Sequence, residues 1–190
     1  MADRLTPEQR HRCMSRIRAK DTRPELWVRK YLYAHGVRYR LHVKRLPGTP
    51  DIVIRRLRTV ILVNGCFWHG HNTAPLPFPV EDERGGVHCK YFVMPRSRTD
   101  FWTNKIERNR ARDLEERQAL QLLGWNVIVI WECQLSNAAV RQQTLMSLIR
   151  TLSQIELAQA ALRPARPSVI RYRLDEEEFP PSLVADEGED

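Results

Sequence analysis

Apolar and polar positions divide the start of the chain into a polar arm and an amphipathic helix. The stretch through Lys20 is polar and rich in arginine, so we expect an exposed arm or a short exposed helix. Asp-Thr-Arg-Pro-Glu at 21–25 has the cap residue and early proline of a helix start, and Gly36 is placed to end the helix. This predicted helix carries Leu26, Val28, Leu32 and Tyr33.

Two β-branched runs follow a proline- and glycine-containing turn at 46–50. They read DIVI at 51–54 and TVILV at 59–63, and four residues, three of them arginine, separate them. This arrangement predicts an antiparallel hairpin with a basic tip. Farther along, WNVIVIW at 125–131 predicts a buried strand.

Residues 72–99 are predicted to form a loop, because their prolines and glycines disfavour regular structure. So long a loop in a compact domain usually has a function or a cross-link. Helices are predicted from about Phe101 to Leu123 and within 137–162. Their expected inner residues are Ile106, Leu114, Leu120 and Leu123 in the first, and Leu145, Leu148, Ile149 and Leu152 in the second.

The order helix, hairpin, helix, strand predicts an α/β fold, with a mixed central sheet flanked by helices. We expect an N-terminal arm at 1–20, a core domain at 21–135, and a C-terminal helical extension with an acidic tail at 136–190. The composition of the tail beyond Pro164 is typical of a mobile segment.

Net charge points to a polyanionic partner. The formal charge is +8, but the last 16 residues carry eight acids and no base, so residues 1–174 carry about +16. A body this basic favours nucleic acid binding, and a solvated basic surface is the alternative. The sequence contains no apolar stretch long enough to span a membrane and no signal peptide, so we expect a cytoplasmic protein. The cysteines then serve more plausibly as thiols or metal ligands than in disulfides.

Acidic residues of the predicted core suggest phosphodiester chemistry. Asp51 follows Pro50 at the mouth of a predicted strand, where a carboxylate can face a divalent cation such as Mg²⁺. Glu25 on the preceding helix supplies a second carboxylate. A turn at Pro50-Asp51 and a salt bridge at Glu25 are the structural alternatives.

The segment CFWHGH at 66–71 concentrates reactive and aromatic side chains. His69 can exchange a proton near neutral pH and is the candidate general acid or base. A zinc ion needs four nitrogen or sulfur ligands, which Cys66, His71, Cys89 and Cys133 could supply. A metal at these four residues would stabilise the long loop, whereas three buried free thiols are the alternative.

Large aromatic residues in a basic protein suggest contact with nucleic acid bases. Phe67 and Trp68 are adjacent, so in an extended segment they face opposite ways and at least one is exposed. Trp102 begins the next helix. These side chains could stack on bases or wedge between them, or simply pack beneath the loop.

Ordered motifs across residues 9–135 give the chain a family resemblance. It resembles the very short patch repair DNA mismatch endonucleases, of the PD-(D/E)xK nuclease superfamily. The motifs are Met14-Ser15, KDTRPE, LPGTPDIVI, GCFWHGH, PRSRTDFWTNKIERNRARD and LGWNVIVIWEC. The resemblance implies a restriction-endonuclease-like fold and a magnesium-dependent nickase. Such an enzyme cuts double-stranded DNA 5′ to the thymine of a T:G mismatch left by deamination of 5-methylcytosine. We expect a monomer in the bacterial cytoplasm, acting on nucleoid DNA, with mismatch-repair proteins as candidate partners.

The resemblance also implies roles for individual residues. Asp51 and the Val63 main-chain carbonyl would hold magnesium, while Glu25, His69 and Asp113 would organise water and proton transfers. Cys66, His71, Cys89 and Cys133 match the structural zinc ligands. The residues that match DNA-intercalating positions are Phe67, Trp68, Trp102 and, from the minor-groove side, Met14.

Two features depart from the family pattern. Residues 72–88 stand as an insertion before Cys89, which in better-known members follows the histidine closely. Asn64 stands where family members carry a histidine or an acid. Asn64 keeps open a zinc-containing DNA-binding protein with impaired catalysis, and a restriction-type endonuclease of the same superfamily is the other alternative.

Overall fold

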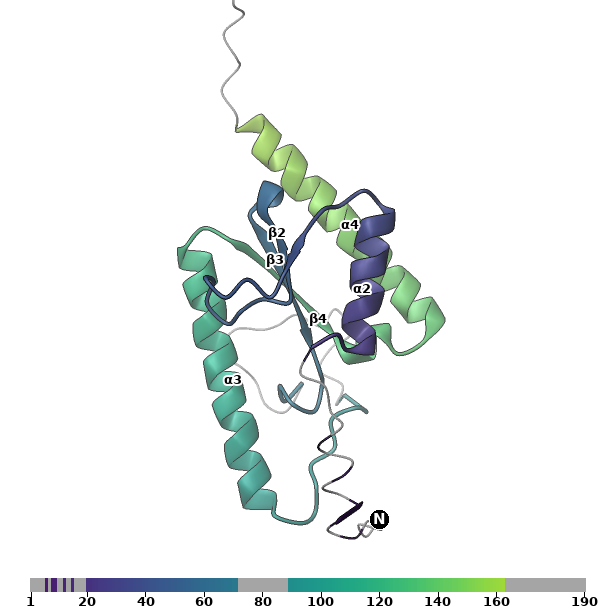
Figure 1. Cartoon of the computed structure of the whole chain (residues 1–190), viewed down its shortest axis with the longest axis vertical. Helices are drawn as coiled ribbons and strands as arrows, with labels where there is room; N and C mark the ends of the chain where they lie inside the picture. The colour runs from purple at the N-terminus through teal and green to yellow at the C-terminus, as the bar shows by residue number, and fades with distance from the viewer. Residues whose placement is uncertain are drawn as a thin grey trace, which may run out of the picture.

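A four-stranded mixed sheet forms the centre of the protein in its computed structural model, which describes residues 6, 8, 9, 12, 15, 20–71 and 89–162 (Figure 1). Its strands, in spatial order, are β1 (Arg40–Leu41), β2 (Ile52–Ile54), β3 (Thr59–Asn64) and β4 (Asn126–Trp131). β1 and β3 each pair antiparallel with β2, whereas β3 and β4 are parallel. The predicted mixed sheet and antiparallel hairpin are confirmed.

The helices predicted after residue 20 are present. α2 (Arg23–Ala34) begins where the Thr22 hydroxyl accepts a hydrogen bond from the Glu25 amide, at 3.4 Å. Gly36, at a φ of 76°, follows its last turn. α3 (Thr99–Leu122) and α4 (Ala138–Ala161) match the other two predicted helices. Short 3₁₀ turns, η1 (Arg55–Leu57) and η2 (Glu132–Leu135), complete the described elements.

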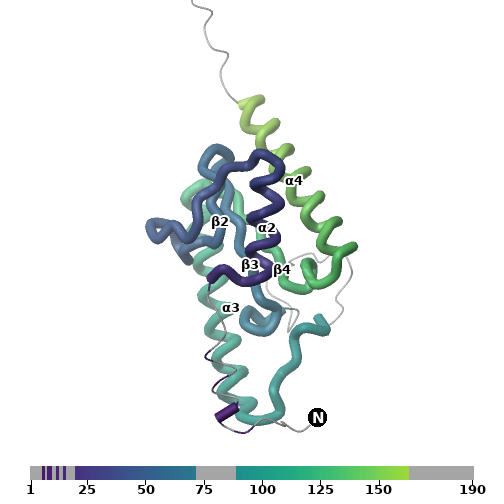
Figure 2. The backbone as a smooth tube through the Cα atoms, turned by 45° about the vertical axis from the view of Figure 1, so that its right-hand side comes forward, coloured from purple at the N-terminus to yellow at the C-terminus, as the bar shows by residue number. Residues whose placement is uncertain are grey.

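The helices cover both faces of the sheet. Alternate strand residues point to opposite faces, so Ile52, Ile54 and Ile61 contact α2 and α4 on one side. Val53 and Val60 contact Leu120 of α3 on the other. Figure 2 shows α2 and α4 together on one side and α3 behind. α4 buries Leu145, Leu148 and Leu152 in the same core as α2, so it is packed against the sheet rather than extended from it.

Some expected core positions are exposed. Leu123 is 52% exposed because it lies at the C-terminal cap of α3, beyond the part that contacts the sheet. Tyr33 on α2 is 62% exposed, and its ring lies under the Arg38 guanidinium. β4 is only partly buried, with Ile130 and Trp131 enclosed, because it is the last strand in the described sheet. The prediction of a buried strand was wrong at Asn126, which is exposed, and is confirmed only in part at 127–129, which are half-buried.

The described part of the predicted arm agrees with a short exposed helix, because residues 8, 9, 12 and 15 are helical and exposed. Of the loop predicted at 72–99, residues 89–98 contain no helix or strand and Thr99 already begins α3, while residues 72–88 and the tail at 163–190 lie outside the described residues. No described helix has the length and apolar character needed to cross a membrane.

Candidate functional site

A cleft of about 1200 Å³ opens at one end of the sheet. β2 begins there and β3 ends there, because the two strands are antiparallel. The N-terminal part of α2 and the middle of α3 form other walls. The ionisable side chains that line the cleft include Lys20, Asp21, Arg23, His42, Asp51, His69, Arg112, Asp113, Glu116 and Glu132.

Asp51 lies at the entrance to β2 and faces this cleft. Its Oδ2 accepts a hydrogen bond from the Val63 amide at 2.8 Å, which places the carboxylate beside the end of β3. Burial raises the pKa of Asp51, and the hydrogen bond from Val63 opposes that rise. The charged carboxylate is therefore under-solvated, and a cation in the cleft would stabilise it. Oxygen donors of this kind suit magnesium.

Glu25 is connected to Asp51 through a histidine that no sequence motif singles out. Glu25 is 2% exposed, and its Oε1 lies 3.2 Å from Arg29 and 3.4 Å from His42 Nε2. The other ring nitrogen of His42 lies 4.0 Å from Asp51 Oδ1. Glu25 thus forms the salt bridge that was one of its two alternatives, and it also lies next to the cleft.

His69 is oriented by an acid from α3. Its Nδ1 lies 2.5 Å from Asp113 Oδ2, and both side chains line the cleft. Engagement of Nδ1 leaves Nε2 as the nitrogen that can exchange a proton with a bound molecule. The structure therefore brings His69, Asp113 and Asp51 to one cleft from three separate parts of the chain.

Asn64, Glu116 and Glu132 also line the cleft. Asn64 is 8% exposed, ends β3 and lies opposite Trp131 of β4. Glu132 follows Trp131 directly and also lines the cleft. Burial raises the pKa of Glu116, which lies against Gly48 in the turn before Asp51. A Cβ atom at Gly48 would lie only 2.5 Å from this carboxylate, so the turn and α3 pack closely.

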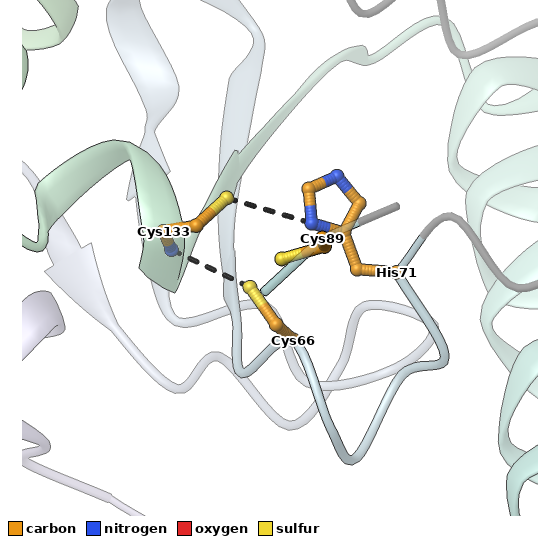
Figure 3. Close-up of side chains that lie close together, drawn as sticks. All are labelled: Cys66, His71, Cys89 and Cys133. Carbon is orange, nitrogen blue, oxygen red and sulfur yellow. Dashed lines mark hydrogen bonds between the residues drawn. The ribbon is translucent and has the colours of Figure 1, made fainter. Parts of the chain in front are cut away.

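Four potential metal ligands converge next to the cleft (Figure 3). The sulfur atoms of Cys66, Cys89 and Cys133 and a ring nitrogen of His71 all lie within 4.8 Å of one another. His71 Nδ1 is 3.5 Å from the Cys133 sulfur, and the His71 ring stacks on Trp131 with 4.0 Å between centroids. Cys66 and His71 are buried.

The electrostatics of this cluster favour a thiolate. The pKa of Cys133 is lowered to about 4, chiefly by the hydrogen bond with Cys66 and also by His71. The same hydrogen bond raises the pKa of Cys66, and burial raises that of Cys89. Three sulfurs and an imidazole make a donor set that could hold one soft or borderline cation in tetrahedral geometry.

A cluster of aromatic rings, which we call the aromatic cluster, lies between the four metal ligands and α3. The Phe67 ring lies 5.1 Å from Trp68 and 5.2 Å from Trp102, with Trp68 and Trp102 6.0 Å apart. The cluster also includes Phe92, stacked 6.1 Å from Phe67, and Phe101, 5.2 Å from Trp102. The three predicted aromatic residues therefore lie together, partly exposed, with two further rings.

Two residues of α3, Asn109 and Lys105, contact the aromatic cluster. The Asn109 amide donates a hydrogen bond to the Trp68 carbonyl at 2.9 Å. The Lys105 ammonium lies 5.3 Å from the Trp68 ring and 5.5 Å from the Trp102 ring. Trp68 is thus restrained through both its backbone and its ring.

Sequence reasoning missed His42, Asn109, Glu116 and Glu132. A helical signal could have found two of them, because Asn109 and Glu116 lie four residues before and three after Asp113, on one face of α3. His42 and Glu132 have no comparable local signal. Met14, a predicted DNA contact, lies outside the described residues.

Comparison with known proteins supports the resemblance found in the motifs. A family model described as "DNA mismatch endonuclease Vsr" matches residues 2–75. The type II nicking enzyme V.XorIIP of Xanthomonas oryzae is 44% identical over 149 residues, which cover 78% of this chain and 98% of that enzyme. The type II nicking enzyme V.NmeAIP of Neisseria meningitidis is 39% identical over 80% of this chain and 97% of its own length. The DNA mismatch endonuclease Vsr of Escherichia coli is 37% identical over 135 residues, 71% of this chain and 76% of that protein.

Proposed function

The chain belongs to the Vsr family of endonucleases, and we propose that it nicks double-stranded DNA 5′ to the thymine of a T:G mismatch. In this proposal the mismatch arises by deamination of 5-methylcytosine, and the sheet corresponds to a restriction-endonuclease-like core. The observation that carries the proposal is the placement of Trp68 and His69 as consecutive residues. Trp68 belongs to the aromatic cluster and His69 lies in the acidic cleft beside Asp51. One rigid segment can therefore engage a disturbed base step and a neighbouring phosphate together.

Asp51 and the main-chain carbonyl of Val63 would hold a magnesium ion. When bound, magnesium neutralises charge on the phosphate and lowers the pKa of water. The residues present fit this role, because Asp51 is an under-solvated carboxylate, and the only basic side chain within ion-pair distance among the described residues is a histidine, His42, at 4.0 Å. Glu25, through His42, helps to fix the geometry around Asp51.

His69 would carry the proton transfers. Asp113 engages Nδ1 and orients the ring. Nε2 then accepts a proton from the attacking water or donates one to the leaving oxygen. Asn64, at the end of β3, cannot ionise. The roles proposed for His69 and Asp113 require no proton transfer at that position.

Cys66, His71, Cys89 and Cys133 would hold a structural zinc ion. Cys66 directly precedes Phe67, and the Phe92 amide donates a hydrogen bond to the Cys89 carbonyl at 2.9 Å. The metal would therefore connect the segments that carry the stacked rings Phe67 and Phe92. Its contribution is to fix the aromatic cluster rather than to take part in hydrolysis.

Nicking of defined duplexes tests the proposed function. With magnesium, we expect one cut in the thymine strand of a duplex with a single T:G pair, and far slower cutting of the matched C:G duplex. The flanking bases and their methylation should be varied, because phosphate contacts alone carry no sequence information. Equal cutting of matched and mismatched duplexes would contradict the proposal.

Trp68→Ala tests the role of the aromatic cluster. Base stacking on an aromatic side chain contributes about 1–3 kcal/mol, so we expect about a 5- to 150-fold loss in kcat/KM on the T:G duplex. Tyr33→Ala removes an exposed aromatic residue of α2 and serves as the control. If both variants lost activity to the same small extent, stacking by Trp68 would play no part in mismatch recognition.

A sequence-specific nicking enzyme is the second candidate, because relatives in Xanthomonas and Neisseria are named type II nicking enzymes. Such an enzyme would depend on direct base contacts and would cut a matched duplex at one sequence. The duplex panel separates the two candidates, because only mismatch recognition predicts preference for T:G within an unchanged flanking sequence.

A further inference from the structure

A row of cationic side chains follows one face of α3. We call Lys105, Arg108 and Arg112 the basic stripe, because spacings of three and four residues place them on the same side of α3. Arg108 and Arg112 are exposed, and Lys105 is partly buried. The N-terminal half of α3 extends beyond the ends of the strands, as Figure 1 shows.

The basic stripe joins the aromatic cluster to the acidic cleft. Lys105, Arg108 and Arg112 line a second hollow of about 550 Å³ on α3, together with Phe101 and the single acid Glu115. At one end, Lys105 contacts the rings of Trp68 and Trp102. At the other end, Arg112 lines both this hollow and the cleft that contains Asp51. Lys105, Arg108 and Arg112 therefore lie between the two parts of the proposed site.

Ion pairing within α3 does not account for the whole stripe. Arg112 lies 3.6 Å from Glu116 and 3.9 Å from Asp113, so its charge is partly neutralised. Arg108 Nε donates to the Asn104 carbonyl of its own helix. Among the described residues, neither Arg108 nor Lys105 is within ion-pair distance of a carboxylate. Arg108 and Arg112 are like charges four residues apart, which destabilises an isolated helix, and an anion bound between them would offset that repulsion.

The spacing of the stripe matches that of a nucleic acid backbone. At about 1.5 Å per residue, Lys105 to Arg108 spans about 4.5 Å along the helix axis and Arg108 to Arg112 about 6 Å. The whole interval of about 10.5 Å corresponds to about three steps of one DNA strand at about 3.4 Å each. We propose that Arg108 and Arg112 bind phosphates about two steps apart on one DNA strand, between the base step at the aromatic cluster and the phosphate at Asp51. This inference rests on the proposed function, and it assigns a backbone-binding surface that holds the two parts of the substrate in register.

Salt dependence of DNA binding tests this surface. Each phosphate contact contributes about −0.9 to the slope of log K against log salt on B-form DNA. We expect Arg108→Gln to make the slope shallower by about 0.9, and Arg108→Gln with Arg112→Gln by up to about 1.8. The loss of affinity should be equal for T:G and matched duplexes. Arg150→Gln, which removes an exposed arginine of α4, is the matched control and should leave the slope unchanged.

The outcomes separate this inference from the proposed function. Arg108→Lys retains the charge and should restore most of the slope, whereas a purely structural role of Arg108 would not be rescued this way. An unchanged slope in Arg108→Gln, with T:G nicking intact in the parent protein, would overturn the phosphate surface alone. A shallower slope in a parent protein that cuts T:G and matched duplexes equally would overturn the mismatch function and leave the surface in place. Equal thermal unfolding midpoints would show that the variants remain folded.

Discussion

Asp51→Asn is expected to reduce nicking of a T:G duplex at least about 1000-fold, while DNA binding stays close to that of the parent protein. Loss of the proposed magnesium ligand removes about 4 kcal/mol or more of transition-state stabilisation, at about 1.4 kcal/mol for each factor of ten. Asparagine can still accept the hydrogen bond from the Val63 amide, so the end of β3 should keep its position. Single-turnover nicking rates and a binding titration measure the two effects separately.

The same substitution should not destabilise the protein. Because burial raises the pKa of Asp51, the charged carboxylate is less favourable in the folded state than in the unfolded state. Stability from this group is present below its unfolded pKa and is lost as the pH rises through the raised folded value. At pH 7 without magnesium, the unfolding midpoint of Asp51→Asn should therefore equal or exceed that of the parent.

Glu156→Gln is the matched control for Asp51→Asn. It neutralises a carboxylate on α4 that is paired with Arg56, away from the cleft. Its nicking rate should be close to that of the parent. Comparable rates in Asp51→Asn and Glu156→Gln would exclude a metal-binding role for Asp51.

Cys66→Ser is expected to abolish stoichiometric zinc binding and to lower stability more than Asp51→Asn, Trp68→Ala or the arginine substitutions do. Structural zinc sites in small peptides contribute about 10–16 kcal/mol, comparable to the whole stability of a domain at about 5–15 kcal/mol. Cys66 is fully buried and lies within 4.8 Å of the other three ligands, so solvent cannot readily replace its sulfur. Metal analysis of the purified protein and its thermal unfolding midpoint measure the two effects.

Cys13→Ser provides the control, because Cys13 lies in the polar arm and is not required as a ligand. This variant should keep its metal and its midpoint. If the parent protein carried no metal and its unfolding midpoint did not change with added zinc, the three cysteines of the cluster would be free thiols rather than zinc ligands. Retention of stoichiometric zinc in Cys66→Ser would show that the metal lies elsewhere.

Much of the fold could be predicted because its signals are local. The Thr22 cap and Gly36 bound α2 in the sequence, and the β-branched runs at 51–54 and 59–63 bound the hairpin. The prediction failed at Leu123 and at the start of β4, where burial depends on what lies next to each element. Periodicity indicates which side of an element is apolar, but not how far the covering element extends.

In the candidate site, too, local sequence patterns indicated residue types, whereas only the structure showed which residues lie together. Individual residue types in CFWHGH and at Pro50-Asp51 suggested metal, aromatic and proton-transfer roles without any neighbours being known. Their roles remain predictions, but the structure brings Cys66, His71, Cys89 and Cys133 together and places Asp113 against His69. His42 and Glu132 joined the cleft with no local signal to select them.

The sequence alone determined the basic body, the order of helices and strands, and the motifs that indicate the family. Tertiary structure alone decided that α3 places Asp113 and Glu116 in the cleft, Asn109 and Lys105 against Trp68, and the basic stripe between them. The reason is physical: capping and periodicity act within a few residues, whereas contacts between distant segments depend on packing of the whole sheet and its helices. For the same reason, only the structure shows that α4 belongs to the core, because its buried leucines pack against α2, β2 and β3.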